Sequence, residues 1–346
     1  MGRGLRRLLG VLAGVAVGVL AAEATLRVLH LGDPVDGADV QLQWTPADLF
    51  TADPDDAIGI RLKPGYVGKQ VYRAAATGDV LLEVSARVTP EGFRDEPTHP
   101  GAPVLLAVGD STTFGQGVAE GESWPGQVGA ALGESWSVLN AGAPGRNLGQ
   151  DVRWVQVHGA EARPSVTILA FYLNDLLPPI HVSGDVAATK LAAPPWADRE
   201  AGLRRWSRLY NLAWRGYERR RLAREVAGDS MDYIERLNRS ARHEDLDREF
   251  GRFVQACRGA HSRPVVLVLP VFDAADPHAA DPILAMAATS AAGQGAAVIQ
   301  AWHTVDNLDI PERVVLPGEF HASAKANGRI AAFVVAELRR LGIVGG

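Results

Sequence analysis

The chain has 346 residues, of which 47% are hydrophobic and 22% charged, an ordinary globular composition with enough apolar material for a sizeable core. Its 35 basic and 40 acidic residues give a net charge of −5, so nothing indicates nucleic acid as a partner. The single cysteine, Cys257, excludes an intramolecular disulfide and a cysteine-based metal site. The sequence predicts neither a cofactor nor a metal ion.

The N-terminus has the order of a targeting segment. Arginines within residues 3–7 precede an uncharged apolar stretch over 8–22. This stretch is shorter than the roughly 20 residues that span a bilayer comfortably. We expect residues 1–32 to form a signal anchor that contacts the membrane, with the catalytic domain outside the cytoplasm, periplasmic or extracellular. The alternatives are a secretory signal cleaved near Ala22-Glu23-Ala24, or a buried helix of the domain itself.

Residues 33–100 are rich in proline, glycine and aspartate and contain β-like runs at 66–72 and 80–88. No catalytic constellation occurs there. This part of the chain is predicted to be a strand-rich extension that lies against the main domain.

Beyond residue 101, short apolar runs alternate with helix-like stretches. The runs predict strands at 104–108, 137–139, 166–171, 265–269 and 297–299, and the stretches predict helices at 124–132, 151–162 and 323–341. Continuous apolar strands separated by helices indicate an α/β fold, with a doubly wound, parallel, five-stranded sheet covered on both faces. Residues 101–346 would form this domain.

A helical insertion is predicted at about 176–263. Within 199–224, apolar residues recur at helical spacing, and the other face carries nine arginines and only two acids. This segment is either a lid or side helix with a solvated arginine face, or a contact for anionic lipid headgroups or an acidic glycan.

Polar or small residues follow the predicted strands where a doubly wound sheet binds its ligands, beyond the carboxyl ends. Ser111 follows the first strand, Gly142 the second and Asn174 the third. His321 comes after the fifth strand, just before the last helix. These four residues should therefore gather at one edge of the sheet.

Their chemistry is that of acyl transfer. The Ser111 hydroxyl becomes a nucleophile when His321 takes its proton, and Glu319 is the nearest carboxylate that could orient the imidazole. The negative charge of the transition state needs donors. The backbone N–H groups of Ser111 and Gly142 and the Asn174 side-chain amide form the predicted oxyanion hole.

The sequence here resembles the SGNH or GDSL hydrolases, whose four blocks centre on serine, glycine, asparagine and histidine in that order. The corresponding blocks read GDSTTFG, NAGAPGRN, YLND and EFHASAKANG, and the resemblance covers roughly Gly92 to Leu341. It implies a flavodoxin-like sheet, a cofactor-free serine esterase and the same nucleophile, base and oxyanion donors. Gly92-Phe93-Arg94 and the Glu23-x-x-x-Arg27 pattern are similar to an exported bacterial subgroup with an N-terminal anchor.

One departure from the family concerns the triad acid. Many members carry aspartate three residues before the histidine, where this chain has Gly318. Glu319 occupies the position two before His321, where some relatives have aspartate. Asp306 and Asp309 are alternative acids, and the enzyme could also work as a Ser-His dyad.

The base and the reaction each have a competing interpretation. His303 is the main rival to His321 as the base. Tyr172 replaces a glycine usual in the family and could narrow the acyl pocket.

The expected function is hydrolysis of acyl esters, including O-acetyl esters on cell-envelope glycans. It competes with O-acetyl transfer through the same residues, and with a catalytically silent protein that binds a glycan or a partner.

Overall fold

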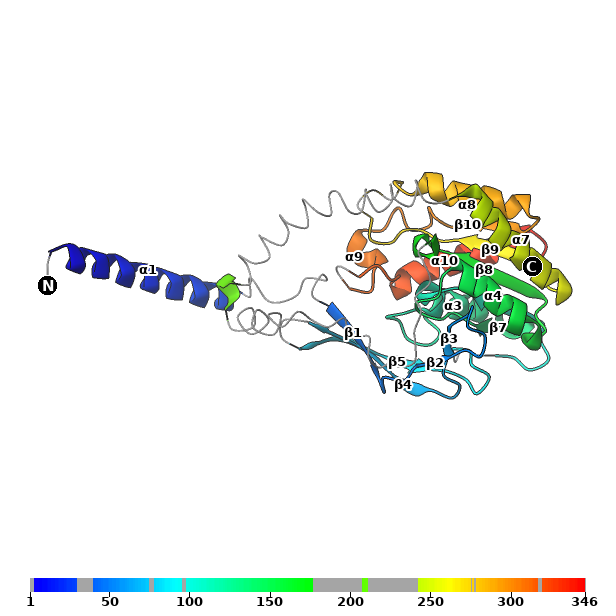
Figure 1. Ribbon diagram of the computed structural model, residues 1–346, viewed down its shortest axis with the longest axis horizontal. Helices are drawn as coiled ribbons and strands as arrows, with labels where there is room; N and C mark the ends of the chain where they lie inside the picture. The colour runs from blue at the N-terminus through cyan, green and yellow to red at the C-terminus, as the bar shows by residue number, and fades with distance from the viewer. Residues whose placement is uncertain are drawn as a thin grey trace.

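The structure is a computed structural model that describes residues 3–29, 40–74, 78–94, 98–176, 207–210, 242–274, 276, 278–316 and 319–345. A sheet with helices on both faces forms the main body, and α1 (Arg3–Val28) lies outside it (Figure 1). The strands of the main body coincide with the apolar runs of the sequence.

The main sheet has five parallel strands, as predicted. They are β6 (Val104–Val108), β7 (Ser137–Asn140), β8 (Val166–Phe171), β9 (Arg263–Val268) and β10 (Ala297–Gln300). Their spatial order is β10-β9-β8-β6-β7, and all pairings are parallel. This is the flavodoxin-like order, in which the direction of strand progression reverses between β6 and β8. Ligand crevices of such sheets lie at this reversal.

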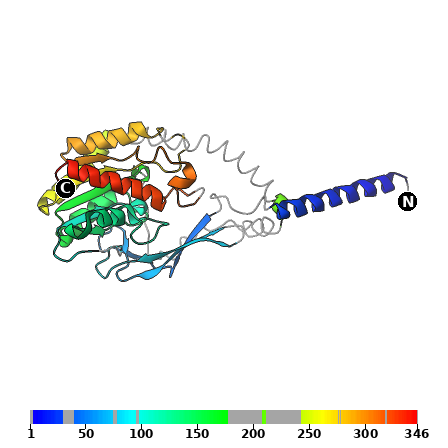
Figure 2. The same ribbon diagram turned by 180° about the vertical axis from the view of Figure 1, so that it is seen from behind.

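Helices cover both faces of the sheet. On one face lie α4 (Leu148–His158), α7 (His243–Gly259) and α8 (Asp281–Gly293), toward the viewer in Figure 1. On the other lie α3 (Trp124–Leu132) and α10 (Ala324–Arg340), which face the viewer in Figure 2. Successive residues of each strand point alternately into the two layers, so the strands are apolar throughout and bury both faces.

Side-chain caps set where three of these helices begin. Ser123 accepts the Gly126 N–H at the start of α3, and Ser323 accepts the Ala326 N–H at the start of α10. A capping box of Asn147 and Gln150 begins α4.

The predicted insertion is wrong at its C-terminal end. Residues 243–259 form α7, a core helix that connects β8 to β9 and packs on the sheet. The segment before α7 also has a helical pattern, so the sequence does not mark where the core helix begins. The basic stretch 199–224 lies outside the described residues apart from 207–210. Helix α8 is an addition to the predicted helices, since its alanine-rich sequence shows little periodicity.

The extension forms two small antiparallel sheets. One pairs β1 (Val40–Thr45), β4 (Val67–Ala74) and β5 (Val80–Arg87), and the other pairs β2 (Phe50–Ala52) with β3 (Ile60–Leu62). Its buried side chains share a hydrophobic cluster with Phe114 and Ala143 of the main domain. The extension therefore packs directly behind the loop that follows β6.

The N-terminal helix contacts the segment at 207–210. The Glu23 carboxylate accepts bonds from the Ser207 hydroxyl and from the Arg208 and Leu209 amides, each at 2.9 Å. No helix among the described residues is both long and apolar enough to cross a membrane. The membrane segment predicted for residues 1–32 therefore gains no support from the structure.

Candidate active site

Ser111 lies at the start of a short helix directly beyond β6. Helix α2 (Ser111–Phe114) begins at Asp110, whose carboxylate accepts the Thr112 N–H at 2.8 Å and the Thr112 hydroxyl at 2.6 Å. Asp110 is thus the N-cap of this helix. As the first helical residue, Ser111 keeps its own N–H outside the intrahelical bonding pattern.

His321 links Ser111 to Glu319. His321 Nε2 lies 3.0 Å from Ser111 Oγ, and His321 Nδ1 lies 2.7 Å from Glu319 Oε2. Ser111 is 5% exposed and His321 3% exposed, so water screens this chain of contacts little. The loop is held in place because Val315 N–H donates to the His321 carbonyl at 2.9 Å.

The partners of His321 define its chemical role. A carboxylate oxygen next to Nδ1 favours the tautomer with hydrogen on Nδ1, which leaves the Nε2 lone pair facing the Ser111 hydroxyl. This arrangement suits a base that takes a proton from Ser111. Gln116 Nε2 lies 3.4 Å from His321 Nδ1, a longer contact than the 2.7 Å between Nδ1 and Glu319, so the glutamate is the closer partner of this nitrogen.

The structure does not bring the alternative acids and the rival base to Ser111. Asp306 bonds to His303 Nδ1 at 2.9 Å, and Asp309 caps α9 (Ile310–Arg313). His303 Nε2 accepts the Trp302 indole N–H at 2.8 Å. Among the described residues, Glu319 is the carboxylate in hydrogen-bond contact with His321. Gly318 lies outside the described residues.

Two of the predicted oxyanion donors, Ser111 and Asn174, lie beyond the carboxyl ends of β6 and β8. The Ser111 N–H has no hydrogen-bond partner among the described residues. Asn174 lies on η4 (Leu173–Leu176), beyond β8, and its amide donates to Asp110 at 2.8 Å. A primary amide carries two N–H groups, so a second one is left for a ligand.

Gly142 has a different environment from the one expected. Its N–H donates to the Asn140 side chain at 3.0 Å. A Cβ atom there would collide with the backbone of α2 at Phe114. Glycine is therefore needed at this position for the close approach of α2. A role as donor would require the N–H to be shared between Asn140 and the substrate.

Arg94 supports α2 from behind, a role that sequence reasoning missed. The side chain is 1% exposed, and its guanidinium donates to the carbonyls of Phe114, of Gly115 at 2.7 Å and of Val118 at 2.6 Å. It also stacks on the Phe114 ring, 4.6 Å from the centroid. In the sequence, Arg94 was singled out only because Gly92-Phe93-Arg94 resembles an exported subgroup, which does not indicate a role in supporting α2.

A buried group of carboxylates lies beneath the site. Arg146 and Asp151 form an ion pair at 2.8 Å with both side chains buried. Asp175 accepts the Tyr172 N–H at 2.8 Å. Burial, together with the charges of Asp110 and Asp151, raises the pKa of Asp175 well above its ordinary value.

The comparisons with known proteins give weak similarity. No protein-family model and no curated protein matches the chain. The crystal structure of TesA has 14% identity and a TM-score of 0.45, covering 69% of this chain and 99% of that one. A lipolytic G-D-S-L family protein from Veillonella parvula has 13% identity, a TM-score of 0.43 and coverages of 69% and 100%. A carbohydrate acetylesterase family member from Sinorhizobium meliloti has 12% identity, a TM-score of 0.42 and coverages of 70% and 100%. Values this low do not establish a common function, so function must be argued from the geometry of the site.

Proposed function

We propose that this protein is a serine esterase of the SGNH type, with Ser111 as nucleophile, His321 as base and Glu319 as the acid of the triad. The observation that carries the proposal is the continuous chain of contacts from Ser111 Oγ to His321 at 3.0 Å and on to Glu319 at 2.7 Å. The order of nucleophile, base and orienting carboxylate is what serine acyl transfer needs.

The reaction would proceed in two halves. Ser111 Oγ attacks the acyl carbonyl carbon while its proton passes to His321 Nε2, and Glu319 stabilises the imidazolium. The Ser111 N–H and the Asn174 amide would hold the negative oxygen, with Gly142 as a third donor if it shares its bond to Asn140. Collapse breaks the ester bond, and the alcohol leaves with the proton from His321. Water then attacks the acyl-enzyme by the reverse sequence, releasing the acid and free Ser111.

The substrate class is a further part of the proposal. We infer acyl esters, including O-acetyl esters of cell-envelope glycans, hydrolysed outside the cytoplasm by a membrane-anchored or secreted enzyme. Support for this location is the arginine-then-apolar order within residues 3–22. Acetyl transfer to a sugar hydroxyl would use the same residues. Measuring released acetate against newly acetylated sugar distinguishes the two reactions.

The geometry disfavours a catalytically silent protein. That alternative would be favoured by a His321 more than a water molecule away from Ser111, without a carboxylate beside the imidazole. His321 instead makes direct contacts with both Ser111 and Glu319.

Labelling with a fluorophosphonate probe tests the proposal. The wild-type chain should be labelled and should hydrolyse p-nitrophenyl acetate, and Ser111→Ala should do neither. Ser85→Ala changes an exposed serine of β5 and should label like the wild type. A wild-type protein that is folded but neither labelled nor active would rule out the esterase function.

A further inference from the structure

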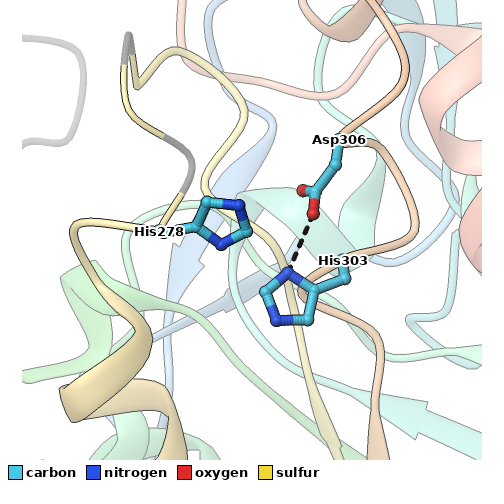
Figure 3. A group of neighbouring side chains, drawn as sticks. All are labelled: His278, His303 and Asp306. Atoms are coloured by element: carbon cyan, nitrogen blue, oxygen red, sulfur yellow. Dashed lines mark hydrogen bonds and ion pairs between the residues drawn. The ribbon is translucent and has the colours of Figure 1, made fainter.

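Two histidines and two aspartates gather at the carboxyl edge of β9 and β10, outside the triad. His278 and Asp281 lie at the start of α8 or just before it, and His303 and Asp306 follow β10. Figure 3 shows His278, His303 and Asp306 facing one another, with ligand-capable atoms within 4.8 Å of each other. No sequence pattern indicates this group, because the two loops are separated by a whole helix and strand.

Each imidazole has a carboxylate beside it. Asp281 Oδ2 lies 3.2 Å from His278 Nδ1 and 3.8 Å from His303 Nε2, so one oxygen faces both rings. Asp306 Oδ2 lies 2.9 Å from His303 Nδ1, on the far side of that ring. His303 is therefore held between Asp281 and Asp306.

The two carboxylates have imidazoles as their ion-pair partners, and the nearby Arg313 guanidinium donates to the Asp306 backbone carbonyl, at 3.4 Å. Among the described residues, the ion-pair contacts of Asp281 and Asp306 are made to imidazoles, and not to lysine or arginine. The second carboxylate oxygens, Asp281 Oδ1 and Asp306 Oδ1, are buried without a hydrogen-bond partner. A divalent cation would supply a partner for these carboxylate oxygens.

We propose that this group is a binding site for a divalent transition-metal ion, with Zn²⁺ as the best fit. The ligands would be Asp281 Oδ2, His303 Nε2 and His278 Nδ1, with the His278 hydrogen moved to Nε2 when the ion binds. Ligand atoms on one tetrahedral zinc ion lie about 3.3 Å apart. Asp281 Oδ2 lies 3.2 Å from His278 Nδ1 and 3.8 Å from His303 Nε2, so the His303 ring would move inward to bind the ion. Two imidazole nitrogens favour zinc over calcium or magnesium, which prefer oxygen ligands.

Asp306 and Trp302 have distinct parts in this site. Asp306 accepts the Nδ1–H of His303, the contact that commonly orients a metal-binding histidine through its other ring nitrogen. The Trp302 indole N–H donates to His303 Nε2 at 2.8 Å, so an ion that binds Nε2 must displace the indole. Since His278 and His303 are exposed, both rings can move to close on an ion.

A bound ion would join the loop before α8 to the loop after β10. The latter leads through α9 (Ile310–Arg313) to Glu319 and His321. The site is thus structural, bracing the segment that carries the catalytic base, and its occupancy does not depend on the esterase function.

Isothermal titration of the metal-free full chain with ZnCl₂ tests the proposal at about pH 7.5. The wild type should bind one equivalent of zinc, and His303→Gln or His278→Gln should weaken binding at least about 100-fold through loss of a ligand. Asp306→Asn should weaken it by about 10- to 100-fold. Trp302→Phe removes the competing donor and should bind zinc at least as tightly as the wild type.

His243→Gln is the matched control, because it changes an exposed histidine of α7 outside the group. The exposed positions of the two ligand histidines should leave their variants folded, which circular dichroism checks. The proposal is overturned if the wild type binds no zinc, if the His278 and His303 variants bind it like the wild type, or if calcium binds more tightly than zinc.

Discussion

At the residue scale, the carboxylate of Glu319 completes the arrangement around His321. Glutamate is longer than aspartate by one methylene group, yet Glu319 reaches Nδ1 from only two residues away, at 2.7 Å. A position two residues before the histidine therefore accommodates a glutamate without loss of contact.

Glu319→Gln should lower kcat by about 10²- to 10⁴-fold with little change in KM. The amide has nearly the same shape but cannot stabilise the imidazolium, and it can bind the wrong tautomer of His321. Steady-state hydrolysis of p-nitrophenyl acetate measures the effect. Asp309→Asn keeps the cap of α9 and should leave kcat unchanged. A Glu319→Gln enzyme with wild-type kcat would mean that the chain works as a dyad.

Arg94→Lys should destabilise the fold and reduce activity. A lysine ammonium cannot reproduce the planar guanidinium that holds three carbonyls and stacks on Phe114. Each buried carbonyl left without a donor costs about 1–3 kcal/mol, so the free energy of unfolding should fall by at least about 2 kcal/mol. Urea unfolding measures the loss, with the exposed Arg258→Lys as control. An unfolding midpoint equal to that of the wild type would contradict this role.

At the scale of elements, the turn after β8 sets the position of the Asn174 amide. In η4, the Asp175 carboxylate accepts the Tyr172 N–H and so closes the turn that carries Asn174. The carboxyl group is buried next to other acids, which raises its pKa. A protonated Asp175 would make the bond to Tyr172 without adding a buried charge.

Asp175→Asn should flatten the dependence of stability on pH. Between the ordinary pKa of about 4 and the raised folded pKa, the folded chain binds a proton that the unfolded chain does not. The contribution of Asp175 to the free energy of unfolding is therefore complete at low pH and is lost as pH rises through the folded pKa. The slope approaches about 1.4 kcal/mol per pH unit.

Urea unfolding of wild type and Asp175→Asn between about pH 4.5 and 8.5 checks this expectation. The asparagine oxygen can still accept the Tyr172 N–H, so the variant should fold. Its stability relative to the wild type should rise with pH. Parallel curves for the two proteins would show that Asp175 does not titrate differently on folding.

At the scale of the whole molecule, the extension and the main domain are packed as one unit behind the nucleophile. Phe114 lies in the same cluster as Leu49, Tyr66 and Val88 of the extension. Gln70 of β4 also accepts the Gly117 N–H at 2.7 Å, in the loop after α2. The extension therefore supports the backbone that presents Ser111.

Two truncations separate the contributions of the N-terminal segments. A chain that begins at residue 40 keeps the extension and should retain hydrolysis of p-nitrophenyl acetate within about two-fold, because its hydrophobic clusters are intact. A chain that begins at residue 98 exposes Phe114 and removes Arg94, so it should fail to fold or lose activity. Thermal unfolding and activity assays compare the two. Full activity of the shorter chain would show that the extension is not needed by the site.

The sequence alone was sufficient to predict the five strands of the parallel sheet and the gathering of Ser111, Asn174 and His321 at its carboxyl edge. An apolar run predicts a strand because both faces of this sheet are buried. The residues that follow parallel strands lie at the same edge of the sheet, so their position in the sequence predicts that they gather there. The bounds of α3, at Trp124–Leu132, were also predictable, since its cap and apolar face are local.

Only the tertiary structure decided which groups touch. Glu319, Asp306 and Asp309 were all possible acids in the sequence, and the loop path after β10 places the first of them against His321. The partner of the Gly142 amide and the position of α7 likewise depend on packing between segments far apart in the chain. Contacts of this kind arise from side-chain shape and burial across elements, which no periodicity within one segment encodes.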